Sequence, residues 1–399
     1  MARRRRPTAR AALVLLSLPL FAAATASLAQ APPQLDMRWP EMARKVVERL
    51  ALEPGERVLA VSAPGVFEEL VPHLRYEVMR AGGVDLGVVP VLSEPAPEAW
   101  SASVLATGAA AALEAYRDLF DEVDAAIMMP GASPQHPAYA ALQDRLRVGR
   151  GRTVHFHWTQ TTESALALPG QPLPPPHEID RVYLRALLET DYDELARVQR
   201  SLASALRAGE LRVTSPLGTD LRLRVGDRPV NLQDGDASAA RADRGVILID
   251  REIELPAGAI RVAPLEETVE GVVAFPPSQW DGRAVEGLVL RFERGRVVEV
   301  SAARGRDAAL AEMEKAGPAG RAFREIAIGL NPLLAVPERF PWIPYYGYGA
   351  GVVRLSLGDN SELGGAVGGG YVRWSFFTDT TVTVGGEVWI AEGRLRPSR

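Results

Sequence analysis

Residues 57–91, RVLAVSAPGVFEELVPHLRYEVMRAGGVDLGVVPV, contain the pattern that decides the fold of the first half of the chain. An apolar run at 57–61 is followed by a helical stretch at 67–81 and by a second apolar run at 84–91. Strand, helix and strand in this order form a βαβ unit, which implies a parallel sheet.

Outward from this unit, the same logic extends the α/β pattern in both directions. A helix is expected at 39–50, and further buried strands are expected within 121–133 and 151–160. The prolines of ALPGQPLPPPHEID (167–180) interrupt helix and strand alike and predict a linker between two lobes.

The second half changes from helical to strand periodicity. A helix is expected at 193–210, and alternating apolar and polar residues then predict hairpins at 211–225, 287–300 and 381–393. Two more helices are expected, at 307–316 and 320–328. We therefore predict a two-lobed chain with an α/β N-terminal lobe, mainly parallel, and a β-rich α+β C-terminal lobe. The expected organisation is a signal peptide at 1–29, an N-terminal domain at 32–170, a linker at 171–185 and a C-terminal domain at 186–399.

The N-terminus has the layout of a secretory signal peptide. Four consecutive arginines, Arg3 to Arg6, precede an apolar run at about 11–26, and small residues lead to a cleavage site near Ala29. An uncleaved anchor is the alternative. Cleavage there removes five arginines and no acid, leaving a net charge of −10. We expect an exported protein, periplasmic or extracellular, without a membrane span in its mature form.

Composition excludes several classes of function. The 399 residues carry a formal charge of −5, which provides no basic surface for nucleic acid, and no cysteine for a disulfide or thiolate ligand. His155 and His157 lie two residues apart on an expected strand, so both side chains leave the same face. Such a pair can bind zinc, but it is also common as a structural pair. Both interpretations stay open.

Six segments, in this order, resemble the aminopeptidase T/aminopeptidase S family of metallopeptidases. ALEPGERVLAV (51–61) is also similar to that family's opening strand. The six are VTSPLGTDLRLRVGDRP (213–229), LPAGAIRVAPLEETVEGVVAF (255–275), GRVVEVSAARG (295–305), FREIAIGLNP (323–332), LSLGDNSELGG (355–365) and VTVGGEVWIAEGRL (382–395).

The resemblance implies a homodimer that removes N-terminal residues from peptides by means of two divalent metal ions in the second lobe. The implied ligands are two glutamates, two histidines, an aspartate and a tyrosine. Carried over to this sequence, those positions hold Ala259, Glu325, Arg354, Ser361, Val372 and Trp374, with the last His-x-Asp pair falling around Val372, Arg373 and Trp374.

Among these positions, only Glu325 still has a side chain of the kind that the resemblance implies as a metal ligand. No histidine follows His177. Asp359, Asn360, Arg354 and Arg373 are expected to line the former cleft. Because a metal pair needs anionic or imidazole ligands, we expect a lost metal site in which a guanidinium pairs with Glu325 or Asp359.

Three interpretations follow. The first is an exported, non-catalytic relative that binds a peptide or another ligand, without a cofactor. The second is an active aminopeptidase that holds two divalent metal ions through an unusual ligand set. The third is a purely structural envelope protein.

Overall fold

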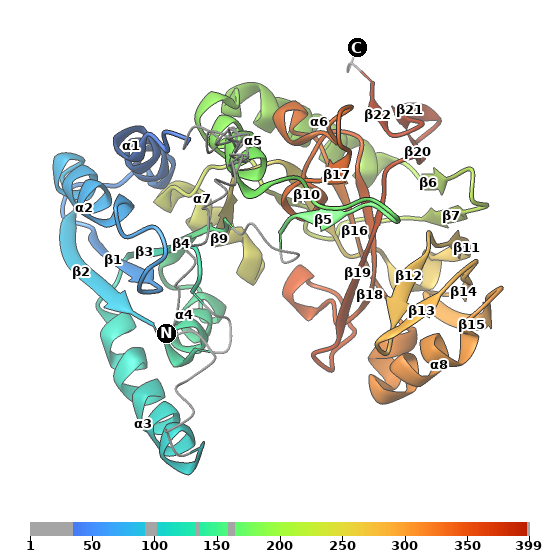
Figure 1. Cartoon of the computed structure of the whole chain (residues 1–399), viewed down its shortest axis with the longest axis horizontal. Helices are drawn as coiled ribbons and strands as arrows, with labels where there is room; N and C mark the ends of the chain where they lie inside the picture. The colour runs from blue at the N-terminus through green and yellow to red at the C-terminus, as the bar shows by residue number, and fades with distance from the viewer. Residues whose placement is uncertain (1–34, 92–101, 133–135, 159–163, 397–399) are drawn as a thin grey trace, which may run out of the picture. The chain divides into compact units, whose positions relative to one another are not determined.

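The computed structural model describes residues 35–91, 102–132, 136–158 and 164–396 (Figure 1). The predicted signal peptide at 1–29, with its cleavage site near Ala29, lies outside these residues. The described helices are α1 Trp39–Leu50, α2 Leu70–Arg80, α3 Ala102–Asp121, α4 Pro137–Arg147, α5 Pro176–Glu189, α6 Tyr192–Ala208, α7 Ala239–Arg244 and α8 Arg306–Lys315.

A parallel sheet forms the N-terminal part, as the βαβ pattern predicts. Its strand order is β2-β1-β3-β4-β9, and every neighbouring pair runs parallel. The strands are β1 Arg57–Ser62, β2 Val84–Pro90, β3 Ala125–Met128, β4 Arg152–Phe156 and β9 Glu252–Leu255. The edge strand β9 comes from about a hundred residues further along the chain than β4.

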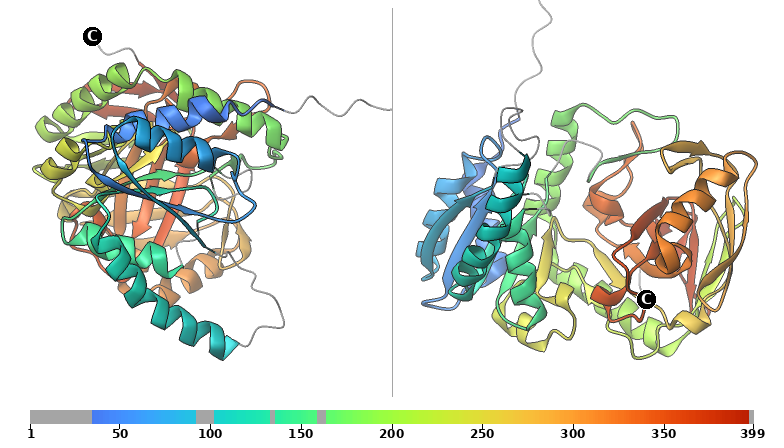
Figure 2. Two further views of the ribbon diagram at one scale, coloured as in Figure 1. Left: turned by 90° about the vertical axis from the view of Figure 1, so that its left-hand side faces the viewer. Right: turned by 90° about the horizontal axis from the view of Figure 1, so that it is seen from below.

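Helices cover both faces of this sheet (Figure 2). On one face Val58 and Ile127 belong to a hydrophobic cluster with Val46 of α1 and Leu74 of α2. On the other face the alternate side chains of β1 and β3 join Phe120 of α3 and residues of α4 in a second cluster. Burial on both sides explains why these strands are continuously apolar.

Two antiparallel sheets make up the C-terminal region, which confirms the predicted fold class. The first antiparallel sheet has the order β19-β18-β16-β10-β8. Its strands are β8 Asn231–Leu232, β10 Ala259–Val262, β16 Phe323–Gly329, β18 Val353–Gly358 and β19 Val372–Phe377.

The second antiparallel sheet has the order β15-β14-β11-β7-β6-β20-β21-β22 and contains the predicted hairpins. Its strands are β6 Leu211–Thr214, β7 Asp220–Leu223, β11 Glu270–Ala274, β14 Val289–Glu293, β15 Arg296–Ser301, β20 Thr381–Val384, β21 Glu387–Ala391 and β22 Arg394–Leu395. Two short pairs complete the described strands, β12 Ser278–Trp280 with β13 Arg283–Val285, and β5 Leu166–Ala167 with β17 Trp342–Ile343.

The structure corrects two local predictions. The helix expected at 320–328 is wrong, because this segment forms the buried strand β16 after a short 3-10 turn, η3 Gly317–Arg321. Both faces of β16 are buried, so the alternation that identifies a strand is missing from its sequence. The proline-rich segment does not remain irregular through residue 185, because α5 begins at Pro176; a proline in the first helical turn loses no intrahelical hydrogen bond.

Among the described residues, no helix is both long enough and apolar enough to cross a membrane.

Candidate functional site

One face of the first antiparallel sheet collects four of the positions implied by the family resemblance. Arg261 of β10 pairs with Ala327 of β16, which pairs with Arg354 of β18. Glu325 pairs with Ser356, which pairs with Trp374 of β19. Since side chains alternate along a strand, Ala259, Glu325, Arg354 and Trp374 leave the sheet on the same side. The opposite side is apolar and carries residues such as Ile326 and Leu355, which belong to the main hydrophobic cluster.

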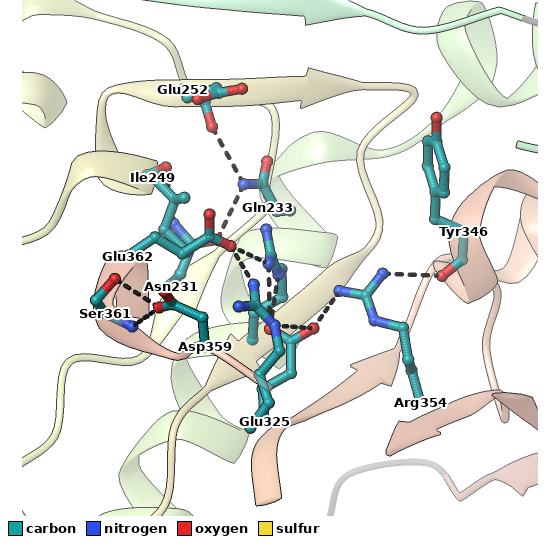
Figure 3. A network of polar contacts seen from close by, with 12 residues as sticks. Asn231, Gln233, Ile249, Glu252, Glu325, Tyr346, Arg354, Asp359, Ser361 and Glu362 are labelled. Atoms are coloured by element: carbon teal, nitrogen blue, oxygen red, sulfur yellow. Dashed lines mark hydrogen bonds and ion pairs between the residues drawn. The ribbon is translucent and has the colours of Figure 1, made fainter. Parts of the chain in front are cut away.

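Glu325 is fully buried and is surrounded by guanidinium groups (Figure 3). Its Oε2 lies 3.1 Å from Nη2 of Arg261, and its Oε1 lies 3.0 Å from Nη2 of Arg354. A third guanidinium, that of Arg324, lies 3.8 Å from Oε1 through its Nε. The expected pairing of Arg354 with Glu325 is therefore present.

The charges of these arginines set the protonation state of Glu325. Burial alone would raise the pKa of this carboxyl, but the guanidinium groups of Arg261, Arg354 and Arg324 outweigh burial and lower the pKa to about 2. Glu325 is therefore a carboxylate at every physiological pH.

An irregularity in β16 explains how two neighbouring residues join one cluster. The pairing of β16 with β18 shifts between Phe323 and Glu325, which leaves Arg324 as the extra residue of a bulge. Arg324 reaches Glu362, and Arg261 also donates to Oε1 of Glu362, at 2.8 Å. We call Arg261, Arg324, Arg354, Glu325 and Glu362 the arginine–glutamate cluster.

The loop GDNSELGG contributes Glu362 to the cluster, whereas its other polar side chains form hydrogen bonds within the loop or with neighbouring segments. Oδ1 of Asp359 accepts hydrogen bonds from the backbone N–H and the hydroxyl of Ser361, at 2.9 and 2.6 Å. The buried Asn360 donates to Oε1 of Glu266 at 3.0 Å. Asp359, Asn360 and Ser361 therefore shape the turn around η6 Ser361–Leu363, and the cluster contacts found in this loop belong to Glu362.

An aromatic surface borders the guanidinium of Arg354. Its Cζ lies 4.5 Å from the ring centroid of Trp374, and its Nη1 donates to the backbone oxygen of Tyr346 at 3.3 Å. Arg354 is only 2% exposed, whereas Trp374 is 39% exposed, so the guanidinium is buried beneath a ring that itself faces solvent in part.

Arg373 and Val372 do not join the cluster. Arg373 was expected to line the same cleft as Arg354, but it precedes Trp374 on β19 and leaves the opposite face. Its guanidinium pairs with Glu312 of α8 at 2.7 Å and lies 3.5 Å from the ring centroid of Trp280. Val372 is 41% exposed at the start of β19.

His155 and His157 lie at the end of β4, next to β9. Nδ1 of His155 pairs with Oε1 of Glu252 at 2.8 Å, and the two imidazole rings are 5.2 Å apart. Nε2 of Gln143 also donates to Glu252, at 2.6 Å. His157 contacts the ring of Tyr346, which in turn contacts Trp374, so ring contacts connect the histidines with the cluster.

The two histidines differ in their protonation. Burial would lower the pKa of His155, but the negative charges of Glu252 and Glu254 raise it above the ordinary value. For His157, burial together with the charge of His155 outweighs the charges of Glu254 and Glu252 and lowers the pKa to about 4. Burial would raise the pKa of Glu252, but His155 and Gln143 lower it to about 2. Nδ1 of His155 is thus engaged in an ion pair and does not face a ligand.

The residues of the described sheet face do not fit a pair of divalent cations. Both oxygens of Glu325 already face guanidinium groups, which repel a cation. Within the described ranges, no group of three or more histidines or carboxylates is arranged to hold a metal ion.

Sequence reasoning missed Arg261, Arg324 and Glu362. Arg261 follows Ala259 by two residues, which places both on one face of a strand, and this spacing could have identified it. Glu362 lies within the quoted GDNSELGG loop. Arg324 joins through a bulge, which leaves no pattern in a single sequence.

Two solved structures share this fold. 2,5-Dihydroxypyridine dioxygenase from Pseudomonas putida KT2440 is 16% identical, with a TM-score of 0.60, and the match covers 92% of this chain and 99% of that one. Wild-type AmpT from Thermus thermophilus is 20% identical, with a TM-score of 0.58, and the match covers 90% of this chain and 99% of that one. Since one neighbour is named a dioxygenase and the other AmpT, the shared fold alone does not assign a reaction.

A family comparison addresses the resemblance more directly. No curated protein sequence matches the chain. The family model described as thermophilic metalloprotease (M29) matches residues 188–333, a segment that includes Arg261, Arg324 and Glu325. The predicted resemblance to the aminopeptidase T/aminopeptidase S family of metallopeptidases is thereby confirmed.

Proposed function

We propose that this chain is a non-catalytic relative of these metallopeptidases that binds a ligand where the relatives hold metal ions. The observation that carries the proposal is the occupation of both oxygens of Glu325 by Arg261 and Arg354. A guanidinium is permanently charged, so neither arginine can release Glu325 to a metal by losing a proton.

The competing function is metal-dependent aminopeptidase activity. For that activity, Glu325 would have to exchange two arginine contacts for metal ions and recruit further carboxylates such as Asp359. The two oxygens of Asp359 already accept hydrogen bonds from Ser361 and from the N–H of Gly370, at 2.9 Å for the latter. The competing function thus requires several existing contacts to break.

Metal content decides between these functions. The purified mature protein is incubated with zinc, cobalt, manganese or calcium, desalted and analysed for bound metal, and aminoacyl p-nitroanilides are offered to each sample. We expect no tightly held ion and no hydrolysis. About two ions per chain together with hydrolysis that chelation abolishes would overturn the proposal. An active metalloaminopeptidase serves as the positive control for loading and assay.

We also propose that the protein is exported and forms a homodimer. Export is supported by Arg3 to Arg6 and the apolar run behind them, and dimerisation by the family resemblance. N-terminal sequencing of the protein from the periplasm or medium tests cleavage near Ala29. Light scattering during size-exclusion chromatography tests the dimer, for which a mass twice that of the mature chain is expected.

A further inference from the structure

We propose that Arg261 and Arg324 form a carboxylate-binding site that Glu362 fills in this structure. A ligand carboxylate, from a small organic acid or the free C-terminus of a peptide, would bind there by displacing the side chain of Glu362. The inference specifies the ligand class of the proposed function and rests on it.

The two arginines converge on a single oxygen. Nη2 of Arg261 donates to Oε1 of Glu362 at 2.8 Å, and Nη2 of Arg324 donates to the same atom. The side chains of Arg261 and Arg324 are 6% and 2% exposed, and they belong to strands of one sheet. The strand backbones and burial therefore hold both guanidinium groups in place, as preorganised donors for a carboxylate.

Glu362 is the most exposed member of the cluster. Its side chain is 39% exposed, whereas Glu325 is fully buried. The hydrogen bonds from Arg261 and from Arg324 both end on Oε1 of Glu362, so one oxygen accepts from both guanidinium groups. A ligand carboxylate can bind these arginines more strongly than Glu362 does, because it can present one oxygen to each of the two guanidinium groups.

The backbone of η6 stays in place while the side chain of Glu362 exchanges. On one side, the buried Asn360 is bonded to Glu266, and on the other, Leu363 is fully buried in a cluster with Ile249 and Ala263. Displacement thus requires only rotation of the Glu362 side chain into solvent.

Electrostatics favour replacement of Glu362 by another anion over an empty site. Without Glu362, the ion pair that remains to Arg324 among the described residues is the 3.8 Å contact with Glu325, and Arg261 would share Glu325 with Arg354. Buried guanidinium groups without sufficient counter-charge are strongly unfavourable. The tethered carboxylate has a high effective concentration, so it competes with any free one and weakens ligand binding in the unaltered protein.

The test removes the competitor. Glu362→Ala is compared with the unaltered mature protein by isothermal titration calorimetry in a carboxylate-free buffer, after metal ions have been removed from protein and buffer with a chelating resin. The probes are acetate, an acetylated tripeptide with a free C-terminus and the same tripeptide as its C-terminal amide. We expect Glu362→Ala to bind acetate or the tripeptide acid at least about tenfold more tightly than the unaltered protein does. The amide should not bind in this range.

Three control variants define the outcome. Glu299→Ala removes an exposed carboxylate 3.0 Å from Arg291 and should leave carboxylate binding unchanged. Glu362→Ala combined with Arg324→Met should lose the gain. Glu362→Gln, which keeps the shape without the charge, should show a smaller gain and replaces Glu362→Ala if that variant does not fold.

The results separate this inference from the proposed function. Equal affinity of Glu362→Ala and the unaltered protein, or equal binding of acid and amide, would overturn the carboxylate site. Tighter binding of the tripeptide acid than of acetate would support the site and identify a peptide C-terminus as its ligand. Metal content decides the non-catalytic proposal independently, because the calorimetry excludes metal ions.

Discussion

The arginine–glutamate cluster and the His155–Glu252 pair are two buried ion-paired sites that respond differently to pH. In both, opposite charges lower the pKa of a buried glutamate to about 2. The cations around Glu325 are guanidinium groups, which stay charged at any physiological pH. The cation beside Glu252 is an imidazole, which loses its charge as the pH rises through its raised pKa. The comparison teaches that two carboxylates with similarly low pKa values can belong to ion pairs of different kinds, one with a permanent cation and one whose cation titrates.

Removal of the negative charge at Glu325 is expected to have the largest effect on stability. Glu325→Gln leaves Arg261 and Arg354 buried without their shared counter-charge, which lowers the free energy of unfolding by about 3–5 kcal/mol. The folded pKa of Glu325 lies below its ordinary value, so its contribution is fully present above about pH 4.5 and is lost as the pH falls toward 2. Urea unfolding at pH 5, 7 and 9 should therefore give the same loss at each pH.

Glu299→Gln is the control for this measurement, because Glu299 pairs with Arg291 at the exposed surface. Its free energy of unfolding should not differ from that of the unaltered protein. A loss at Glu325→Gln that varies between pH 5 and 9, or that does not exceed the control, would contradict the fixed-charge interpretation.

Removal of the charge at Glu252 should have a smaller effect that depends on pH. Glu252→Gln loses the ion pair with His155 and weakens the bond from Gln143, which costs about 2 kcal/mol at pH 6. The folded pKa of His155 is raised, so the stabilisation is fully present below pH 6.5 and is lost as the pH rises through the folded pKa. The deficit of Glu252→Gln should therefore shrink between pH 6 and pH 9 in urea unfolding.

NMR titration of the imidazole resonances provides an independent check. His155 should titrate above its ordinary pKa and His157 at about 4. Two imidazoles that titrate together near 6.5 would show that Glu252 does not hold His155 in its charged form.

The sequence allowed prediction of those elements whose patterns are local. The helix at 39–50 matches α1 in both bounds, and the hairpins at 211–225 and 287–300 show the alternation of half-buried strands. Strand β9 was not predicted, because it pairs with β4 about a hundred residues earlier in the chain. Strand β16 was assigned to a helix, because both of its faces are buried and its residues do not alternate in polarity.

The candidate site was predictable only where its contacts do not depend on how the strands pair. The pairing of Arg354 with Glu325 could be expected, because a buried carboxylate without its metal requires another cation. The direction of Arg373 depended on the register of β19, and one residue changes the face on which a strand side chain lies. Arg324 depended on a bulge, which forms only when β16 and β18 pair in three dimensions.

Substitution of Trp374 is expected to have the smallest effect on stability. It tests whether the aromatic ring stabilises the arginine–glutamate cluster in addition to the ion pairs within it. Its ring lies 4.5 Å from Cζ of Arg354 and also contacts Tyr346. Trp374→Leu should lower the free energy of unfolding by about 1 kcal/mol, because it keeps an apolar side chain but removes the aromatic face. Trp374→Phe retains such a face and should lose less. Equal losses in the two variants would assign the effect to packing and leave Arg354 stabilised by Glu325 and the backbone oxygen of Tyr346. A double-mutant cycle with Arg354→Met measures the coupling directly, since a cation–π contact requires both groups.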